Sequence, residues 1–558
     1  MARPKQRSFD LRAQRLKFLL GAVVVLAGAR AFQVGVVDAA SLKKDAAVQQ
    51  SITASVPAAR GDITDRHGVE LAVSQPMVTV TADPMMISHP ARVASQLAPL
   101  LGRNVAEIQA KLSNRNQQYV RLARRVSVSD AKRVRKLKID GIDFEKTMGR
   151  SYPRGAQAGQ LIGLVGDEGH GLSGLELSFD KTLAGTDGQR TTVTDRLGQP
   201  ILVTDSKAVR TGSTLQLTID APVQDQVERV LAGVGRVFQP KGATAIVMDP
   251  RTGNILALAN WPAVNANTIG NASDYAQMNR ASGFTYEPGS TFKAFTVASA
   301  LEEGEVTPST PFNLPTLLHI GDKTIKDAHD RGDETLSVSE ILAQSSNVGA
   351  ALIGLQMKRQ KLDHWIRRFG FASPTKSGFP GEEQGLVLPL SKYSSATVGN
   401  EAMGQGLSVT PLQMVQGYAA LANGGILRSP RIAQRANGVS IPATPGHRVI
   451  SERVSRLIRK MLRGVLAEGG TASGAEIPGF DLAGKTGTAQ KVDPATGTYS
   501  DSRYIASFIG FAPAKSPKLL TAVLVDEPQG DIYGGSVAAP AFSRIMAFAL
   551  PYLGISPR

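Results

Sequence analysis

Residues 18–37 form the most hydrophobic stretch of the chain, interrupted only by Arg30 and Gln33. Twenty residues are enough for a helix to cross a bilayer. Six basic residues precede the stretch: Arg3, Lys5, Arg7, Arg12, Arg15 and Lys17. Positive flanks stay on the cytoplasmic side of a membrane. We therefore expect a basic cytoplasmic tail over residues 1–17, a membrane anchor over 18–37, and the rest of the chain outside.

The same stretch also fits a cleavable signal peptide, because Ala27, Gly28 and Ala29 form a small-residue cleavage pattern after a short apolar run. Arg30 adds a cost of roughly 2.5–3.5 kcal/mol if it lies at the bilayer centre. It lies nearer the outer end, where its long side chain can reach the interface. We favour the uncleaved anchor. Both interpretations place residues after 38 outside the cytoplasm.

Past residue 38, the pattern of apolar positions changes near residue 212. Residues 39–212 alternate short strand-like runs with basic helical stretches and contain no catalytic cluster. After them, residues 215–220 indicate a strand and 223–237 a helix with apolar residues at helical spacing. Residues 243–260 alternate like a hairpin around Asp-Pro-Arg-Thr-Gly. We predict a non-catalytic domain over 39–212 and a catalytic domain over 213–558.

Composition narrows the chemistry. The chain has no cysteine and only 7 histidines, which disfavours thiol catalysis and metal sites. Its net charge is +16. The basic residues show neither zinc-finger spacing nor an RNA-binding aromatic signature. We interpret the charge as favouring an anionic membrane surface or an anionic substrate, and we expect no nucleic acid partner.

A first candidate motif is Glu-Pro-Gly-Ser-Thr-Phe-Lys, which contains Ser290 and Lys293. Pro-Gly before an apolar helical run places Ser290 at or near the first helical turn, with Lys293 on the same face. A serine hydroxyl becomes a strong nucleophile when a neighbouring base, such as a lysine with a lowered pKa, takes its proton. By itself the motif is weak, because a capping serine and a surface lysine produce the same letters.

Two further motifs follow. Ser345 and Asn347, in Ser-Ser-Asn, offer a hydroxyl and an amide that can pass a proton to a leaving amine and hold a substrate backbone. Polar residues in a turn between helices are the simpler interpretation. The third motif comprises Lys485, Thr486, Gly487 and Thr488. There a glycine lets a substrate pack against a strand, the lysine can meet a carboxylate, and the Thr488 N–H can face an oxyanion.

The order and spacing of the three motifs carry more weight than each motif alone. Ser345 follows Ser290 by 55 residues, and Lys485 follows Ser345 by 140. This set resembles that of the penicillin-binding protein and serine β-lactamase superfamily. Residues 60–72, 150–166, 171–185, 195–201, 403–425 and 533–542 also resemble segments of class B penicillin-binding proteins, most closely the septal FtsI-type subfamily. Gln405 fits elongation-type relatives equally well.

The resemblance implies an α+β multi-domain protein: a membrane helix, an elongated non-catalytic α+β pedestal, and a transpeptidase domain whose antiparallel sheet is flanked by helices. It implies that Ser290 attacks peptidoglycan stem peptides ending in D-Ala-D-Ala. Lys293 is then the base, and Ser345 and Asn347 assist. Lys485, Thr486 and Thr488 hold the substrate carboxylate, and the N–H groups of Ser290 and Thr488 form the oxyanion hole.

The resemblance also implies partners and a location. β-Lactams trap Ser290, no metal or organic cofactor is required, and the expected protein partners are an FtsW-type polytopic glycosyltransferase and other division proteins. The expected location is the bacterial cytoplasmic (inner) membrane, crossed once. Other readings stay open: an elongation-type transpeptidase, a β-lactamase or D,D-carboxypeptidase using Glu382 or Glu383 as a base, or a β-lactam sensor or scaffold without enzymatic activity.

Overall fold

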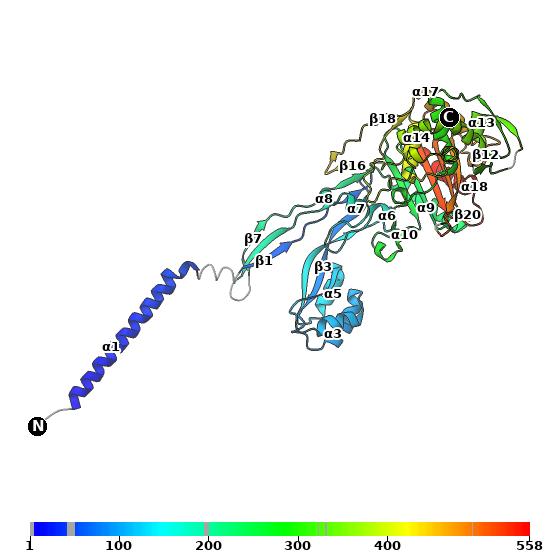
Figure 1. The fold of residues 1–558 in the computed structure, drawn as a ribbon. Coiled ribbons are helices and arrows are strands. Elements are labelled where there is room, and N and C mark those ends of the chain that lie inside the picture. The colour runs from blue at the N-terminus through cyan, green and yellow to red at the C-terminus, as the bar shows by residue number, and fades with distance from the viewer. Residues whose placement is uncertain are drawn as a thin grey trace. The chain divides into compact units, whose positions relative to one another are not determined.

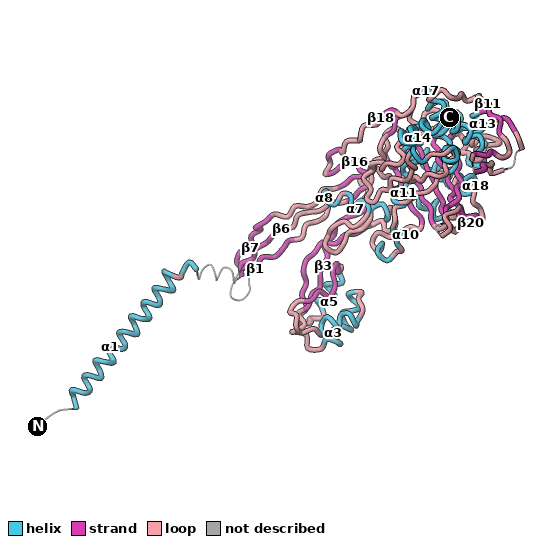
Figure 2. Tube along the Cα trace, in the orientation of Figure 1, coloured by secondary structure: helices cyan, strands magenta, loops and turns pink. Residues whose placement is uncertain are grey.

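The structure is a computed structural model that describes residues 5–41, 51–194, 200–321, 323–329, 332–493 and 495–557 (Figures 1 and 2). Residues 1–4 of the predicted basic tail lie outside this range. So do residues 195–199, which belong to one of the segments that carry the resemblance. By its internal contacts the chain forms two units, residues 1–59 with 185–211, and residues 60–184 with 212–558.

The first unit begins with the N-terminal helix. Helix α1 spans Lys5–Phe32 and continues as a π-helical turn, Gln33–Val37. Its apolar side chains are exposed, and Leu11–Val37 is apolar and long enough to cross a membrane. Arg30 donates a 2.9 Å hydrogen bond to Gln33 Oε1. The helix begins before the predicted residue 18, because the basic and polar residues ahead of the apolar run are also good helix formers.

The same unit contains a small antiparallel sheet. Its strands are β1 (Ser51–Val56), β6 (Gly188–Thr194) and β7 (Pro200–Lys207), in the order β1-β6-β7. Val193 pairs with Ser51 on one side and with Leu202 on the other. Sequence-distant segments therefore share one sheet.

In the second unit, the long strands β3 (Glu70–Ala82) and β5 (Ile142–Ser151) pair with each other, and β4 (Val120–Val126) pairs with β3. Helices α3 (Pro90–Leu101), α4 (Val105–Ser113) and α5 (Val128–Lys136) pack against this ribbon. Leu97, Ile108, Leu112 and Leu122 lie in its buried core. The subdomain thus has a hydrophobic core of its own.

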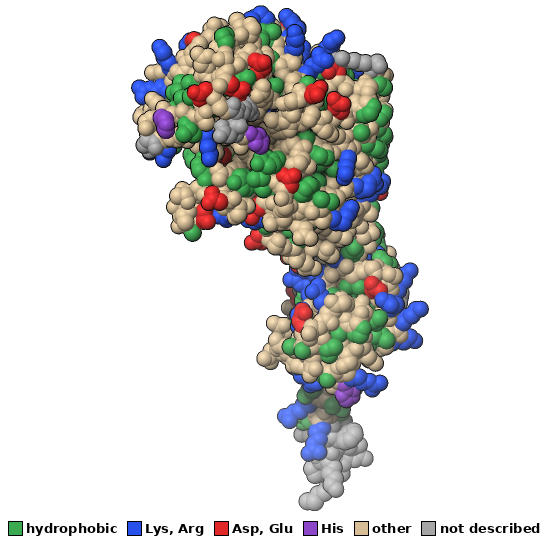
Figure 3. All heavy atoms as spheres, turned by 90° about the vertical axis from the view of Figure 1, so that its right-hand side faces the viewer, with side chains coloured by type: hydrophobic (Ala, Val, Ile, Leu, Met, Phe, Trp, Pro, Cys, Tyr) green, Lys and Arg blue, Asp and Glu red, His purple; other side chains and the backbone are tan. Residues whose placement is uncertain are grey.

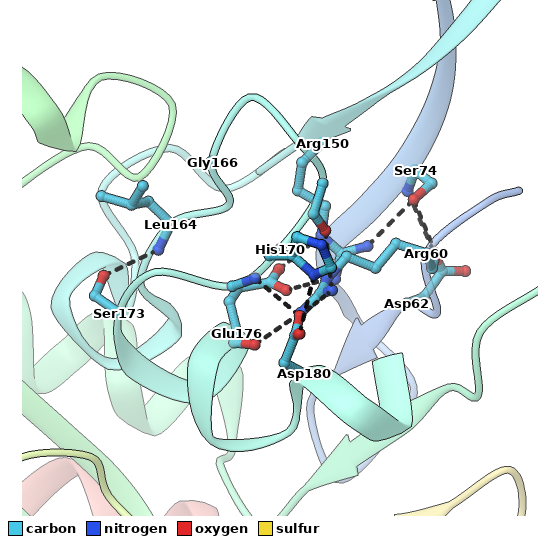
Figure 4. A network of polar contacts seen from close by, with 12 residues as sticks. Arg60, Asp62, Ser74, Arg150, Leu164, Gly166, His170, Ser173, Glu176 and Asp180 are labelled. Carbon is cyan, nitrogen blue, oxygen red and sulfur yellow. Dashed lines mark hydrogen bonds and ion pairs between the residues drawn. The ribbon is translucent and has the colours of Figure 1, made fainter. Parts of the chain in front are cut away.

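A buried ionic network links the segment before β2 and the end of β5 to the short helices that follow β5. Glu176 accepts hydrogen bonds from Arg60 Nε and Arg150 Nε, both at 2.6 Å, and Arg60 also donates to Asp180 at 2.6 Å (Figure 4). The Glu176 side chain is fully buried. Glu176 belongs to α7 (Gly174–Ser178), between α6 (Gly159–Ile162) and α8 (Asp180–Leu183). A buried carboxylate of this kind is tolerated because both cations satisfy it.

A mixed sheet joins this region to the catalytic half. Its path runs β17-β16-β8-β2-β3-β4, and β5 pairs with β3. Strand β2 (Ile63–Thr64) runs parallel to β8 (Leu215–Leu217). Strands β16 (Ala433–Ala436) and β17 (Val439–Ser440) extend it. The predicted strand over 215–220 is therefore shorter than expected, because Asp220 already caps the next helix.

The C-terminal part of the chain is built on a five-stranded antiparallel sheet in the order β10-β9-β21-β20-β19. Strands β9 (Gly242–Met248) and β10 (Ile255–Trp261) confirm the predicted hairpin. The other strands are β19 (Ala483–Val492), β20 (Tyr499–Ala512) and β21 (Leu519–Asp526). The sheet ends on one side at β19.

Both faces of this sheet are covered. Side chains alternate between faces along a strand, so Ala245 and Val247 join one core and Ile246 and Met248 the other. Helices α9 (Ala221–Phe238) and α19 (Ala539–Tyr552) contribute to the first core. The second core is completed by α12 (Lys293–Glu302), α13 (Val338–Gln344), α14 (Asn347–Arg368), α15 (Ser395–Ala402), α16 (Pro411–Ala422) and α17 (Glu452–Arg463).

Short elements complete the domain. Strands β11 (Pro311–Leu314) and β14 (Glu334–Ser337) enclose the hairpin of β12 (Leu318–Ile320) and β13 (Lys323–Ile325), and β15 (Ile426–Leu427) pairs with β18 (His447–Arg448). The short helices are Ile269–Asn271, α10 (Asp274–Gln277), α11 (Arg280–Gly283), Leu390–Lys392, Ser473–Ala475 and α18 (Gly534–Val537). On the face in Figure 3, basic side chains are spread out with acidic ones between them. The predicted α+β class is confirmed.

Candidate active site

Ser290 lies in a short 3-10 turn, Gly289–Thr291, directly before α12. This agrees with the prediction that Ser290 lies at or near the first turn of a helix, since α12 begins at Lys293. Gly289 has a φ of +54°, a conformation that glycine adopts without strain. Thr291 anchors the turn, since its hydroxyl donates to the Pro288 carbonyl at 2.8 Å and its carbonyl accepts from the Tyr418 hydroxyl at 2.6 Å. The turn is therefore held in place, and it leaves Ser290 partly exposed.

Lys293 is buried, with only 1% of its surface exposed. Its ammonium donates to Asn347 Oδ1 at 2.6 Å and to the Ser345 carbonyl at 2.7 Å, and it lies 3.4 Å from Ser345 Oγ. Burying a lysine costs free energy unless such acceptors surround it. Lys293 and Ser345 are 52 residues apart along the chain, and the contacts of the Lys293 ammonium bring the first two motifs together.

The second motif is the junction between α13 and α14. Ser345 ends α13 in a left-handed conformation with a φ of +66°, which is uncommon for a residue with a side chain. Ser346 caps α14, accepting from the Gly349 N–H at 2.9 Å. Asn347 is the first residue of α14. The motif does lie in a turn between two helices, and this turn directs its polar groups at Lys293.

The third motif lies on β19, at the edge of the five-stranded sheet. Lys485 is fully buried, and its ammonium lies 3.3 Å from both the carbonyl and the hydroxyl of Thr486. Thr486 Oγ1 is 2.6 Å from Thr471 Oγ1, and Thr488 Oγ1 accepts from the Gly534 N–H at 3.1 Å. Burial, and next the charge of Lys293, lower the pKa of Lys485 well below its usual value.

Gly487 lets β19 approach the serine turn. A Cβ at this position would collide with Ser507 Oγ and would lie 3.0 Å from Thr291 Cγ2. The sequence had suggested that this glycine makes room for a substrate. The structure shows that the close neighbours are the protein's own side chains. All three motifs therefore line one site, with the edge strand β19 beside the serine turn.

Sequence reasoning missed Glu287, the residue before the Pro-Gly pair. Its carboxylate accepts from the Gly406 N–H at 3.1 Å and from the Tyr499 hydroxyl at 3.0 Å. Burial raises the pKa of Glu287. It ties the serine turn to the loop at Gly406 and to the start of β20 at Tyr499, which are 119 and 212 residues away along the chain. Only its place beside the first motif could have drawn attention to it.

Glu382, suggested as a base for a hydrolase, is engaged elsewhere. Its Oε1 accepts from the Thr375 N–H at 2.8 Å and from the Thr375 hydroxyl, and its Oε2 accepts from the Ser377 hydroxyl at 3.2 Å. The neighbouring Glu383 is exposed. Glu382 is therefore part of a local turn, as its three acceptor bonds indicate.

Comparison with known proteins agrees with this architecture. Residues 243–547 match the family model for the penicillin binding protein transpeptidase domain, and residues 55–217 match the penicillin-binding protein dimerisation domain. The chain belongs to the penicillin-binding proteins, in the class that joins these two domains in one chain, the class B serine D,D-transpeptidases.

Named relatives extend over almost the whole chain. It is 34% identical to "Probable peptidoglycan D,D-transpeptidase PenA" of Neisseria meningitidis, over 97% of this chain and 93% of that one. It is also 34% identical to peptidoglycan D,D-transpeptidase FtsI of Escherichia coli, over 97% and 90%. The crystal structure of penicillin binding protein 3 from Mycobacterium tuberculosis with aztreonam superposes with a TM-score of 0.71 at 28% identity, over 90% and 98%.

Proposed function

We propose that this protein cross-links peptidoglycan stem peptides through an acyl-enzyme on Ser290, during septal wall synthesis in cell division. The observation that carries the proposal is the buried Lys293 ammonium, held by Ser345 and Asn347, three residues after the partly exposed Ser290. The septal assignment is supported by the identity to FtsI of Escherichia coli. An elongation role is the alternative.

Acylation can be written with the residues that line the site. Ser290 Oγ attacks the carbonyl carbon of the penultimate D-alanine while Lys293, in its neutral form, takes the hydroxyl proton. The carbonyl oxygen becomes an oxyanion facing the N–H groups of Ser290 and Thr488. When the oxyanion collapses, the peptide C–N bond breaks and D-alanine leaves with a proton that passes from Lys293 through the Ser345 hydroxyl. Asn347 keeps the lysine in place and contacts the donor peptide.

The terminal carboxylate of the donor peptide is assigned to Lys485, Thr486 and Thr488. Lys485 supplies positive charge, and the two threonine hydroxyls supply hydrogen bonds. The buried Lys485 ammonium has two Thr486 oxygens near it and a second lysine charge close by. A carboxylate would offset both its desolvation and that repulsion. The structure therefore favours an anionic ligand at this point.

Deacylation is assigned to an amino group of a second stem peptide, which attacks the ester carbonyl and releases Ser290. A hydrolase would need a base that activates water at this ester. Of the two acidic candidates from the sequence, Glu382 is bound within its own turn and Glu383 is exposed. This engagement favours transfer to an amine over β-lactamase or D,D-carboxypeptidase activity. β-Lactams would acylate Ser290 in place of the stem peptide.

The remaining assignments concern the membrane and the partners. We assign α1 to a single-pass anchor in the cytoplasmic membrane, with residues 1–17 inside and the catalytic domain outside. Residues 39–212 are assigned as a non-catalytic pedestal and residues 213–558 as the transpeptidase domain. The pedestal and anchor would bind an FtsW-type glycosyltransferase and other division proteins. Deleting residues 39–212 from an exported, penicillin-reactive protein should abolish co-purification with that partner.

The chemistry is tested by labelling the full-length protein with a fluorescent penicillin, beside a folded Ser290→Ala variant. We expect a long-lived adduct on the parent and none on the variant. Rapid loss of the penicillin without stable labelling would replace the transpeptidase with a hydrolase. An inert penicillin, together with no cross-linking of stem peptides, would leave only the sensor or scaffold.

A further inference from the structure

Asp327 lies outside the three motifs, in the segment between β13 and β14, yet it contacts the second motif. Its Oδ1 accepts hydrogen bonds from the N–H groups of Asn347 and Val348, the latter at 3.1 Å. These are the first two residues of α14. The first N–H groups of a helix have no partner within the helix, and a carboxylate there also meets the positive end of the helix dipole.

The neighbouring residue orients the Asn347 side chain. The Lys326 carbonyl accepts from Asn347 Nδ2 at 3.0 Å. Because a carbonyl can only accept, the amide nitrogen of Asn347 must face Lys326, and its oxygen then faces the opposite way. That oxygen is the 2.6 Å acceptor of the Lys293 ammonium. Lys326 and Asp327 thus determine both the position of Asn347 and the direction of its amide.

We propose that Asp327 is a positioning residue of the transpeptidase: its carboxylate holds the first turn of α14 and, through Asn347, places the side-chain nitrogen of Lys293 for its reaction with Ser290. The inference rests on the proposed acyl-enzyme at Ser290. Ser345, the other acceptor of Lys293, precedes the same helix in a left-handed conformation. A shift of the α14 terminus would therefore displace every acceptor that Lys293 has in this motif.

The segment also extends toward the third motif. The ring of His329 lies 6.1 Å from the ring of Tyr533, centre to centre. Tyr533 precedes Gly534, whose N–H donates to Thr488 Oγ1. Residues 326–329 therefore contact the Asn347 side of the site directly and the Thr488 side through one ring contact. The segment is therefore placed to hold the Asn347 side and the Thr488 side of the site in a fixed relative position.

The test compares acylation rates of the full-length protein with a fluorescent penicillin. Asp327→Ala should slow the first-order acylation step by about 10–100-fold, since a displacement of about 1 Å in a catalytic group has an effect of that size. Noncovalent penicillin binding should change much less than the acylation step, because Lys485 and its threonines are untouched. Asp327→Asn keeps an acceptor oxygen but no charge and should recover part of the rate.

Asp333→Ala is the matched control. Asp333 belongs to the same segment between β13 and β14. Its carboxylate also accepts two hydrogen bonds, both from Thr316: from the N–H at 2.7 Å and from the hydroxyl at 2.9 Å. It contacts none of the motif residues in the described parts of the chain. We expect the acylation rate of Asp333→Ala to match that of the parent. The control therefore separates a general loosening of the segment between β13 and β14 from the loss of the Asp327 contacts.

A double-mutant cycle decides whether Asp327 acts through Asn347. If it does, adding Asp327→Ala to Asn347→Ala should change the rate by less than about twofold, because the contact of the Asn347 side chain with Lys293 is already gone. Equal slowing in both backgrounds, or a parent-like rate in Asp327→Ala, would overturn the inference. If the alanine variant does not fold, a parent-like rate in Asp327→Asn would overturn it. Failure of the parent to label on Ser290 would instead reject the proposed function.

Discussion

Gly289 and Gly404 lie back to back at the base of the serine turn. The Gly289 N–H donates a 2.9 Å hydrogen bond to the Gly404 carbonyl, and a Cβ on Gly404 would collide with the Gly289 carbonyl oxygen. Both residues have positive φ angles. The serine turn can therefore occupy its place only while position 404 lacks a side chain.

Gly404→Ala should slow acylation of Ser290 by about 100-fold or more, because the added methyl group must push the serine turn out of line. The rate of labelling with a fluorescent penicillin measures this. Gly406→Ala is the control: Gly406 has a similar φ of +76°, but a Cβ there meets only Asn400 Cβ at 3.9 Å. Equal rates for the two variants would show that backbone strain, rather than the collision, causes the loss.

Lys485→Met should weaken the enzyme and stabilise the fold. Without the charge, acylation by a carboxylate-bearing penicillin should fall about 10–100-fold, the range expected for a hydrogen bond between charged groups. The melting temperature should rise by about 2–4 °C for each kcal/mol of removed desolvation cost. Lys491→Met on the same strand should lower it, because Lys491 is paired with Asp526 and Glu527.

The same substitution should change the pH dependence of stability. The pKa of Lys485 is lowered in the folded protein, whereas an unfolded lysine titrates near about 10.4. Between these two values the unfolded chain binds more protons, so the free energy of unfolding of the parent rises with pH. Melting curves across this window should show a smaller rise for Lys485→Met. An unchanged slope would mean that Lys485 is not the group responsible.

Glu176→Gln should destabilise the protein by about 3–5 kcal/mol, because it leaves the buried guanidinium group of Arg150 without its counter-charge and leaves Arg60 with Asp180 alone. Urea unfolding of the residue 60–184 region, followed with a local probe, measures this. Glu168→Gln removes the partner of Arg124 at a side chain that is 78% exposed, and it should cost under about 1 kcal/mol. A similar loss in both variants would contradict the importance of burial.

Local patterns predicted several elements correctly. The alternation of residues 243–260 predicted the β9–β10 hairpin, and the apolar spacing after residue 223 predicted α9. Such patterns succeed because a strand or helix exposes its sides at a fixed period. The position of Ser290 at or near the start of a helix was also predicted, whereas its 3-10 turn, held by Gly289 and its partner Gly404, was not.

The sequence by itself determined the candidate groups: Ser290, Lys293, Ser345, Asn347 and the segment Lys485–Thr488 could be named from their residue types, order and spacing. Only the tertiary structure decided which atoms meet. Lys293 reaches Asn347, Asp327 reaches the start of α14, and Glu287 reaches Gly406 and Tyr499. These pairs are 20 to 212 residues apart. Hydrogen bonds act over about 3 Å, so contacts between distant segments exist only once packing has brought those segments together.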